Sequence, residues 1–104
     1  MINGCEVHVA FEGDLVKVLS GVATELEKLG YEPKKASAKE LKMSFAGKMI
    51  TSDPNQMKHA VTVSPSGEGL SFKFGTGLIA SSWSDADKAW AQARAQGVVD
   101  AIAS

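Results

Sequence analysis

The alanine-rich stretch from Ser84 to Ala103 places the strongest constraint on how this chain folds. Alanine is the best helix former, so these residues predict a C-terminal helix. With about 100° of rotation per residue, this helix carries two apolar stripes and therefore needs two partner surfaces. The first stripe, small except for one large side chain, consists of Ala86, Ala89, Trp90, Ala93, Gly97 and Ala101. The second stripe consists of Ala91, Ala95, Val98 and Ile102.

The first thirty residues predict one strand followed by one helix. Residues 5–11 alternate between apolar and other side chains, which is the period of a strand with one covered face. Asp14 is a good N-cap, and residues 15–29 carry apolar side chains at the i, i+3, i+4, i+7 spacing of an amphipathic helix. Gly30 stands where a helix commonly ends in a left-handed residue.

The centre of the chain predicts a meander of short strands. Alternating apolar residues mark strands at 41–45, 60–64 and 70–74, and residues 65–69 are expected to form a loop. Residues 31–39 are ambiguous, because Pro33 argues against a central strand and favours pairing at a sheet edge. Residues 48–52 are also ambiguous. They would form a short return strand if Gly47-Lys48 makes a hairpin turn.

These elements predict one α+β domain over residues 1–104, with the order β-α-β(4)-α. The simplest arrangement is a two-layer sandwich, an antiparallel sheet with both helices on one face. This element order is similar to that of the TATA-binding-protein half-domain and of reduced helix-grip folds, a likeness that implies a fold but no function. The strand residues expected to face the helices are Cys5, Val7, Val9, Phe11, Leu41, Met43, Phe45, Val61, Val63, Leu70, Phe72 and Phe74.

The charge of the chain indicates no particular partner. A net charge of -1 gives no overall attraction to nucleic acid or to an acidic membrane. Seven lysines against three acids give residues 33–73 a charge of +4, and four basic against nine acidic residues give the remainder -5. Such patterning is typical of solvated faces. Because no apolar stretch approaches the ~20 residues of a membrane span and no signal peptide opens the chain, a cytoplasmic location without membrane contact is expected.

The motif closest to a functional signature has a structural explanation. Residues 75–80 match G-x-G-x-x-A after a predicted strand. A dinucleotide site needs a helix that opens within the glycines and a later strand with an acidic residue, whereas here the helix begins near Ser84 and ends the sequence. The glycines are therefore interpreted as a turn, and the hydroxyls of Ser81, Ser82 and Ser84 as helix caps rather than an anion site.

The titratable residues predict no catalytic or metal centre. Cys5, the only cysteine, is expected to point inward, while His8 points outward with Glu6, so thiol and imidazole lie on opposite faces. Two histidines without a fixed spacing are a poor basis for a metal site. We expect an unreactive Cys5, no catalytic residue, no metal and no cofactor.

The sequence favours a small non-enzymatic interaction or assembly domain, most simply a homodimer. One stripe of the last helix would meet the sheet, and the other would either pack on the first helix or remain for a partner. The proposed interaction residues are Ala91, Ala95, Val98 and Ile102.

Two alternatives stay open. A carrier of a small apolar ligand would hold it between sheet and helices, in a cavity lined by Met43, Met49, Phe72, Phe74 and Trp90. Weak nucleic-acid binding through the lysine-rich central strands is less favoured, because the aromatic side chains needed for base stacking point inward. An enclosed apolar cavity would support the carrier, and a closed core with an apolar outer patch would support the interaction domain.

Overall fold

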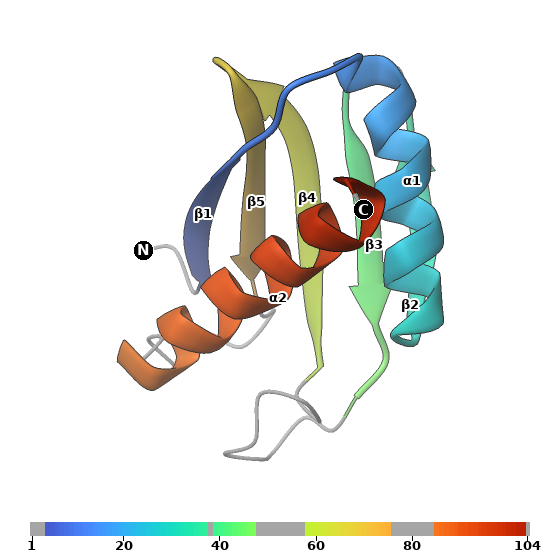
Figure 1. The fold of residues 1–104 in the computed structure, drawn as a ribbon. Coiled ribbons are helices and arrows are strands. Elements are labelled where there is room, and N and C mark those ends of the chain that lie inside the picture. Colours follow the sequence, from blue (N-terminus) through green and yellow to red (C-terminus); the bar gives the residue numbers. More distant parts are fainter. Residues whose placement is uncertain (1–3, 38, 48–57, 76–84, 104) are drawn as a thin grey trace.

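Five strands and two helices form a two-layer α+β structure in the computed structural model, which describes residues 4–37, 39–47, 58–75 and 85–103 (Figure 1). All neighbouring strands are antiparallel, and their order across the sheet is β1-β5-β4-β3-β2. This confirms the expected fold class. In chain order the elements are β1 (Gly4–Ala10), α1 (Leu15–Lys28), β2 (Tyr31–Ala36), β3 (Leu41–Phe45), β4 (His59–Ser66), β5 (Gly69–Gly75) and α2 (Asp85–Ala103).

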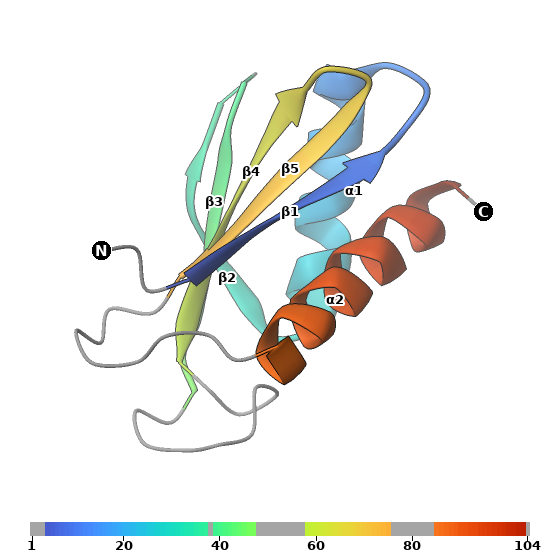
Figure 2. The same ribbon diagram turned by 90° about the vertical axis from the view of Figure 1, so that its left-hand side faces the viewer.

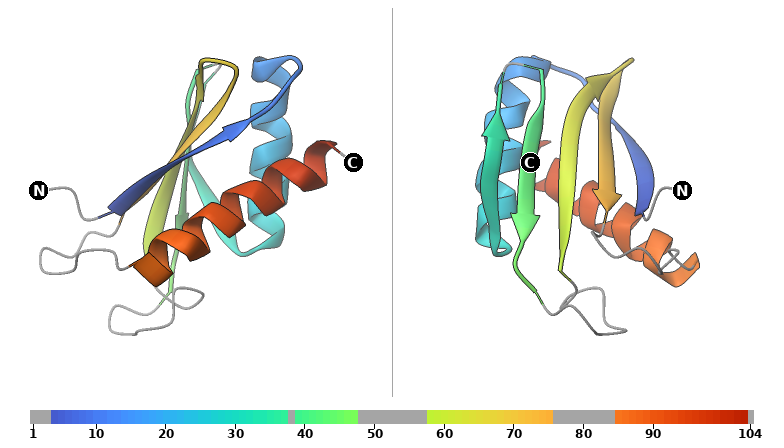
Figure 3. Two further views of the ribbon diagram at one scale, coloured as in Figure 1. Left: turned by 60° about the vertical axis from the view of Figure 1, so that its left-hand side comes forward. Right: turned by 180° about the vertical axis from the view of Figure 1, so that it is seen from behind.

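Both helices cover the same face of the sheet, and the described residues leave the other face uncovered (Figures 2 and 3). α1 packs on β2, β3 and β4, whereas α2 crosses diagonally and packs on β1 and on α1. Alternate strand residues point toward the helices, as expected for a sheet with one covered face. The fully buried side chains with the largest volumes are Phe72, Leu26, Met43, Leu70, Val22, Val61 and Val63.

The ends of α1 follow from local chemistry. The Oδ1 atom of Asp14 accepts a hydrogen bond from the backbone N–H of Lys17 at 3.4 Å, the bond that an N-cap makes. At the other end, Gly30 has a φ of 98° and its N–H donates to the carbonyl of Glu27 at 3.1 Å. A side chain rarely adopts this left-handed conformation, so glycine ends the helix here.

The segment 65–69 corrects one expectation, because it is a tight turn rather than a loop. β4 continues to Ser66 and β5 begins at Gly69, so only two residues connect them. The first of these, Gly67, has a φ of 59°, which suits a two-residue hairpin turn. Pro65 is tolerated within β4 because β3 pairs with β4 only as far as Val63, and β4 is an edge beyond that point.

β2 is an edge strand, which agrees with the interpretation of Pro33. It pairs with β3 alone, and the register shifts between Pro33 and Lys35, which marks a β-bulge or similar irregularity. The return strand expected at 48–52, its Gly47-Lys48 turn and the serines before α2 lie outside the described residues, apart from Gly47 itself.

α2 uses its two stripes differently from the expectation. Ala91 and Ala95 are fully buried and Val98 is 3% exposed, so the stripe assigned to a partner faces the chain's own core. Ile102 is half-buried and lies against Gly21 of α1, where a Cβ atom would be 3.4 Å from its side chain. The stripe of Ala86, Ala89, Ala93, Gly97 and Ala101 is exposed instead.

The second stripe of α2 is the buried one because it has the larger aliphatic volume, and the buried Val99 extends it.

No helix among the described residues is long and apolar enough to cross a membrane.

Candidate binding groove

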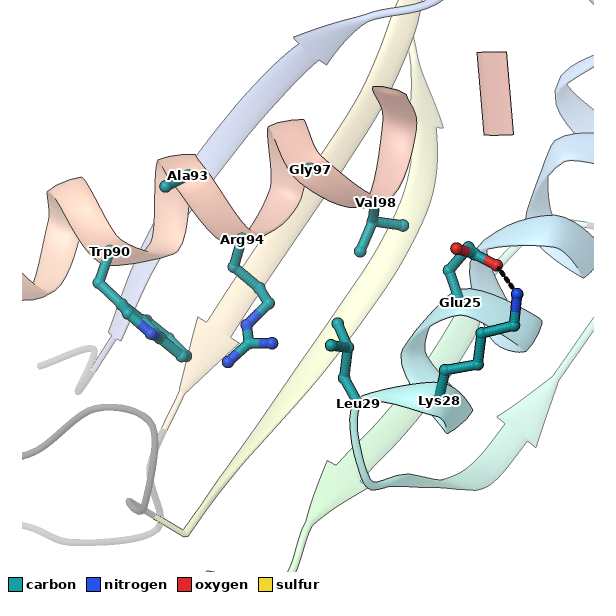
Figure 4. A pocket seen from close by; sticks show the side chains of 8 residues that line it. All are labelled: Glu25, Lys28, Leu29, Trp90, Ala93, Arg94, Gly97 and Val98. Atoms are coloured by element: carbon teal, nitrogen blue, oxygen red, sulfur yellow. Dashed lines mark hydrogen bonds and ion pairs between the residues drawn. The ribbon is translucent and has the colours of Figure 1, made fainter. Parts of the chain in front are cut away.

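An open groove lies where the C-terminal end of α1 approaches the middle of α2 (Figure 4). Its volume is about 540 Å³, within the range of about 300–1,000 Å³ that is typical of ligand pockets. Leu29, just after α1, is 42% exposed, which makes it the large apolar side chain most open to solvent among the described residues. The groove is lined by Glu25, Lys28, Leu29, Trp90, Ala93, Arg94, Gly97 and Val98.

Two cations and one carboxylate line this mainly apolar groove, which gives it a net charge of +1. The Nζ atom of Lys28 lies 2.8 Å from Oε2 of Glu25, an ion pair within α1. The guanidinium carbon of Arg94 lies 5.1 Å from the centre of the Trp90 ring, a cation–π contact. Figure 4 shows Trp90, Arg94 and Val98 projecting from α2 toward the α1 side of the groove.

A buried histidine lies behind the groove, in contact with one of its walls. His59 is 4% exposed, and its ring centre lies 5.3 Å from that of Trp90 and 5.4 Å from that of Phe45. Its Nε2 atom hydrogen-bonds with the hydroxyl of Tyr31, which satisfies a polar atom that would otherwise be costly to bury. Phe74 completes the cluster, with its ring centre 6.1 Å from the imidazole.

Sequence reasoning missed His59, although the signal was present. The predicted strand began at Ala60, one residue too late. Val61 and Val63 point inward, so the period of two places residue 59 on the same face once the strand is extended. The register confirms this placement, because His59 pairs with the inward-facing Phe45 of β3.

Four of the five residues proposed to line a ligand cavity are described by the structure, and these four do not come together around one. Met43 and Phe72 are fully buried and Phe74 is 2% exposed, so they are parts of a closed core. Trp90 lines the groove between the helices, and its half-buried ring also packs edge-on against His59 and Phe74 of the sheet. Met49 lies outside the described residues.

The four proposed interaction residues also lie in different places and do not form one surface. Val98 lines the groove, Ala91 and Ala95 lie in the core, and Ile102 packs at the crossing of the two helices. The apolar patch that the second stripe would have formed is therefore absent from α2 over its described residues. The groove and the exposed first stripe share Ala93 and Gly97 instead.

The outer face of the sheet carries exposed lysines, as the alternation predicts. Lys42 and Lys73 lie on this face, and Nζ of Lys73 is 4.0 Å from Oε2 of Glu6. Tyr31, the one aromatic considered for base stacking, is 3% exposed and belongs to the histidine cluster. The described part of this face therefore offers positive charge without a stacking ring.

The residues considered for catalysis or metal binding are separated or already hydrogen-bonded. Cys5 is half-buried; burial raises the pKa of its thiol, and the nearby Lys88 lowers it by less. The Nε2 atom of His8 donates to the carbonyl of Ser66 at 2.8 Å, and Glu6 accepts a hydrogen bond from Ser71 at 2.6 Å. Among the described residues, no three His, Cys, Asp or Glu side chains are grouped so that they would hold a metal ion.

The buried phenol of Tyr31 makes the stability of the fold depend on pH in the alkaline range. Burial raises the pKa of its phenol to about 12 from 10, with Arg94 opposing the rise. As the pH rises, the phenol of Tyr31 ionises in the unfolded chain before it does so in the folded chain. Its contribution to the free energy of unfolding is therefore complete below pH 10 and is lost as the pH rises through 12. We expect the free energy of unfolding to fall by about 1.4 kcal/mol between pH 9 and pH 11 relative to Tyr31→Phe. Urea titrations at both pH values measure this difference. If the free energy of unfolding changed by the same amount between pH 9 and pH 11 in the original chain and in Tyr31→Phe, the prediction would be wrong.

No protein-family model matches the sequence, and no curated protein matches it. The function must therefore be inferred from the geometry.

Proposed function

We propose that this chain is a non-enzymatic protein-interaction domain that holds an apolar segment of a partner protein in the groove between α1 and α2. The main support is the contrast between a closed core and an open apolar groove. The sheet–helix interior is filled by fully buried side chains such as Met43 and Phe72, whereas Leu29 and Trp90 remain partly accessible. This contrast favours an interaction domain over a carrier with an enclosed ligand.

Gly97 supports the same proposal. It lies within α2, where glycine costs about 1 kcal/mol of helix stability relative to alanine. Its φ is not positive, and apart from its chain neighbours and the adjoining backbone of α2 no described atom lies within 4 Å of the position that its Cβ would occupy. Nothing in the described chain therefore requires glycine here. A glycine allows another backbone to approach closely, which is what a segment lying along α2 would need.

The charges of the groove indicate the chemistry of the partner segment. The wall is mainly apolar, with Arg94 and Lys28 against Glu25. A partner with a large apolar side chain beside an acidic residue complements both features, because the apolar group fills the groove and the acid lies near its cations.

A phage-displayed random-peptide library tests the proposal with a defined probe. We expect enriched peptides to carry an aromatic or leucine anchor next to Asp or Glu. A synthetic enriched peptide should bind Gly97→Leu at least about tenfold more weakly than the original chain, a difference of about 1.4 kcal/mol measured by calorimetry. A Cβ atom at this position has open space around it, so a leucine side chain can extend over the groove.

Gln92→Leu is the matched control, because Gln92 is exposed on α2 but does not line the groove. This variant should bind the peptide as the original chain does. Equal binding to Gly97→Leu, or the absence of any enriched peptide, would overturn the proposal.

A further inference from the structure

The two edges of the sheet differ in their protection. The β2 edge has the features that discourage pairing with another strand: Pro33, an irregularity beside it, and two exposed lysines at 34 and 35. The β1 edge has seven residues, Gly4–Ala10, with neither proline nor lysine and with an uninterrupted register against β5. Among the described residues β1 is also the last strand on its side of the sheet, so its outer backbone groups pair with no described strand.

The backbone groups that face this open edge can be assigned. The N–H of Phe11 donates to the carbonyl of Glu68 at 3.1 Å, across the junction between β1 and β5. In an antiparallel strand the backbone groups alternate between the two sides, so residues 5, 7 and 9 also bond toward β5. The N–H and C=O groups of Glu6 and His8 therefore point away from the sheet.

We propose that β1 pairs antiparallel with β1 of a second copy of this chain, about a two-fold axis at Val7, so that two five-stranded sheets become one. Only even-numbered residues present their backbone groups to the open edge, so they must lie opposite one another. Centring on Val7 pairs all seven residues of Gly4–Ala10, whereas centring on Glu6 or His8 leaves residues at one end unpaired.

The charges select the same register. With the axis at Val7, each Glu6 lies opposite the partner's His8 on the outer face, so each carboxylate meets an imidazole rather than a like charge. With the axis at Glu6, the carboxylate would lie opposite the partner's Glu6, and like charges directly opposite are destabilising. The β1 edge is thus complementary to itself in the register that pairs the whole strand.

The helices are compatible with this pairing, and α2 adds a second contact between the protomers. The first turns of α2 extend past β1 (Figures 1 and 3). A two-fold axis perpendicular to the sheet places both α2 helices on one face, where these turns reach the other protomer. Ala86 and Ala89 on the exposed stripe are small, so these two positions add little bulk to that surface. The groove near Leu29 lies at the α1 side and stays open in each protomer.

Sedimentation equilibrium of the whole chain over a wide concentration range tests this inference. The original chain should form a dimer, and His8→Pro should associate at least about thirtyfold more weakly, because each strand loses one interstrand donor. His8→Pro should keep its fold, since this N–H makes no bond to β5. His8→Ala is the matched control: it removes the same side chain but keeps the donor, and it should still dimerise.

A charge exchange tests the register. His8→Glu should weaken the dimer by placing two acids opposite each other, and Glu6→Lys combined with His8→Glu should restore it. A monomeric original chain at the highest concentration, or a dimer that survives His8→Pro, would overturn the inference. A dimer abolished by Gly97→Leu but not by His8→Pro would place the contact at the groove and equally overturn pairing through β1.

Discussion

Gly69→Ala is expected to destabilise the protein by about 3 kcal/mol or more, at or above the upper end of the usual cost of overpacking. Gly69 opens β5 and pairs with Ala10 of β1. A Cβ atom at this position would lie 2.1 Å from the carbonyl oxygen of Val9 and 2.8 Å from Cα of Ala10. Both are backbone atoms, so no side-chain rotation relieves the overlap, and β1 must move away from β5.

Gly97→Ala is the matched control, because it makes the same chemical change at a glycine with open space around it. It should stabilise the protein by about 1 kcal/mol through helix propensity. Urea denaturation followed by circular dichroism measures both variants. If Gly69→Ala unfolded at the same urea concentration as the original chain, the close approach of β1 and β5 would be wrong.

The fold was predictable because local signals and tertiary packing agree over most of the chain. Strong periodicity identified α1, and Asp14 and Gly30 marked its ends to within a residue. The alternation of β1, β3 and β5 correctly placed their apolar side chains toward the helices. The turn after Pro65 was missed because proline is unfavourable in a strand with two neighbours, and the sequence does not show that β3 ends before it.

The groove was less predictable because it depends on how the two helices cross. Periodicity showed two stripes on α2 but not which one would be buried, since the first carries the large Trp90 and the second carries the aliphatic Val98 and Ile102. The crossing point depends on a tertiary contact, Ile102 against Gly21, which no local pattern reveals. Trp90 was identified as an important side chain, but its partners His59 and Arg94 appear only once the chain is folded.

Substitutions of Leu26 and Leu29, three residues apart, are expected to have opposite effects: the first should lower stability and the second should weaken binding. Leu26 is fully buried on the inner face of α1, so Leu26→Ala should lower the free energy of unfolding by about 2–5 kcal/mol, the range for a truncated core leucine. Leu29 is 42% exposed at the groove, so Leu29→Ala should change stability by about 0.5 kcal/mol or less.

The binding measurements should show the reverse order. Because Leu29 lines the groove and Leu26 does not, Leu29→Ala should weaken binding of a groove-selected peptide, whereas Leu26→Ala should retain it at temperatures where the variant is folded. Urea denaturation and calorimetric titration on the same two samples give both quantities. A loss of stability in Leu29→Ala as large as that in Leu26→Ala would mean that Leu29 belongs to the core, and the groove would then lose its exposed apolar wall.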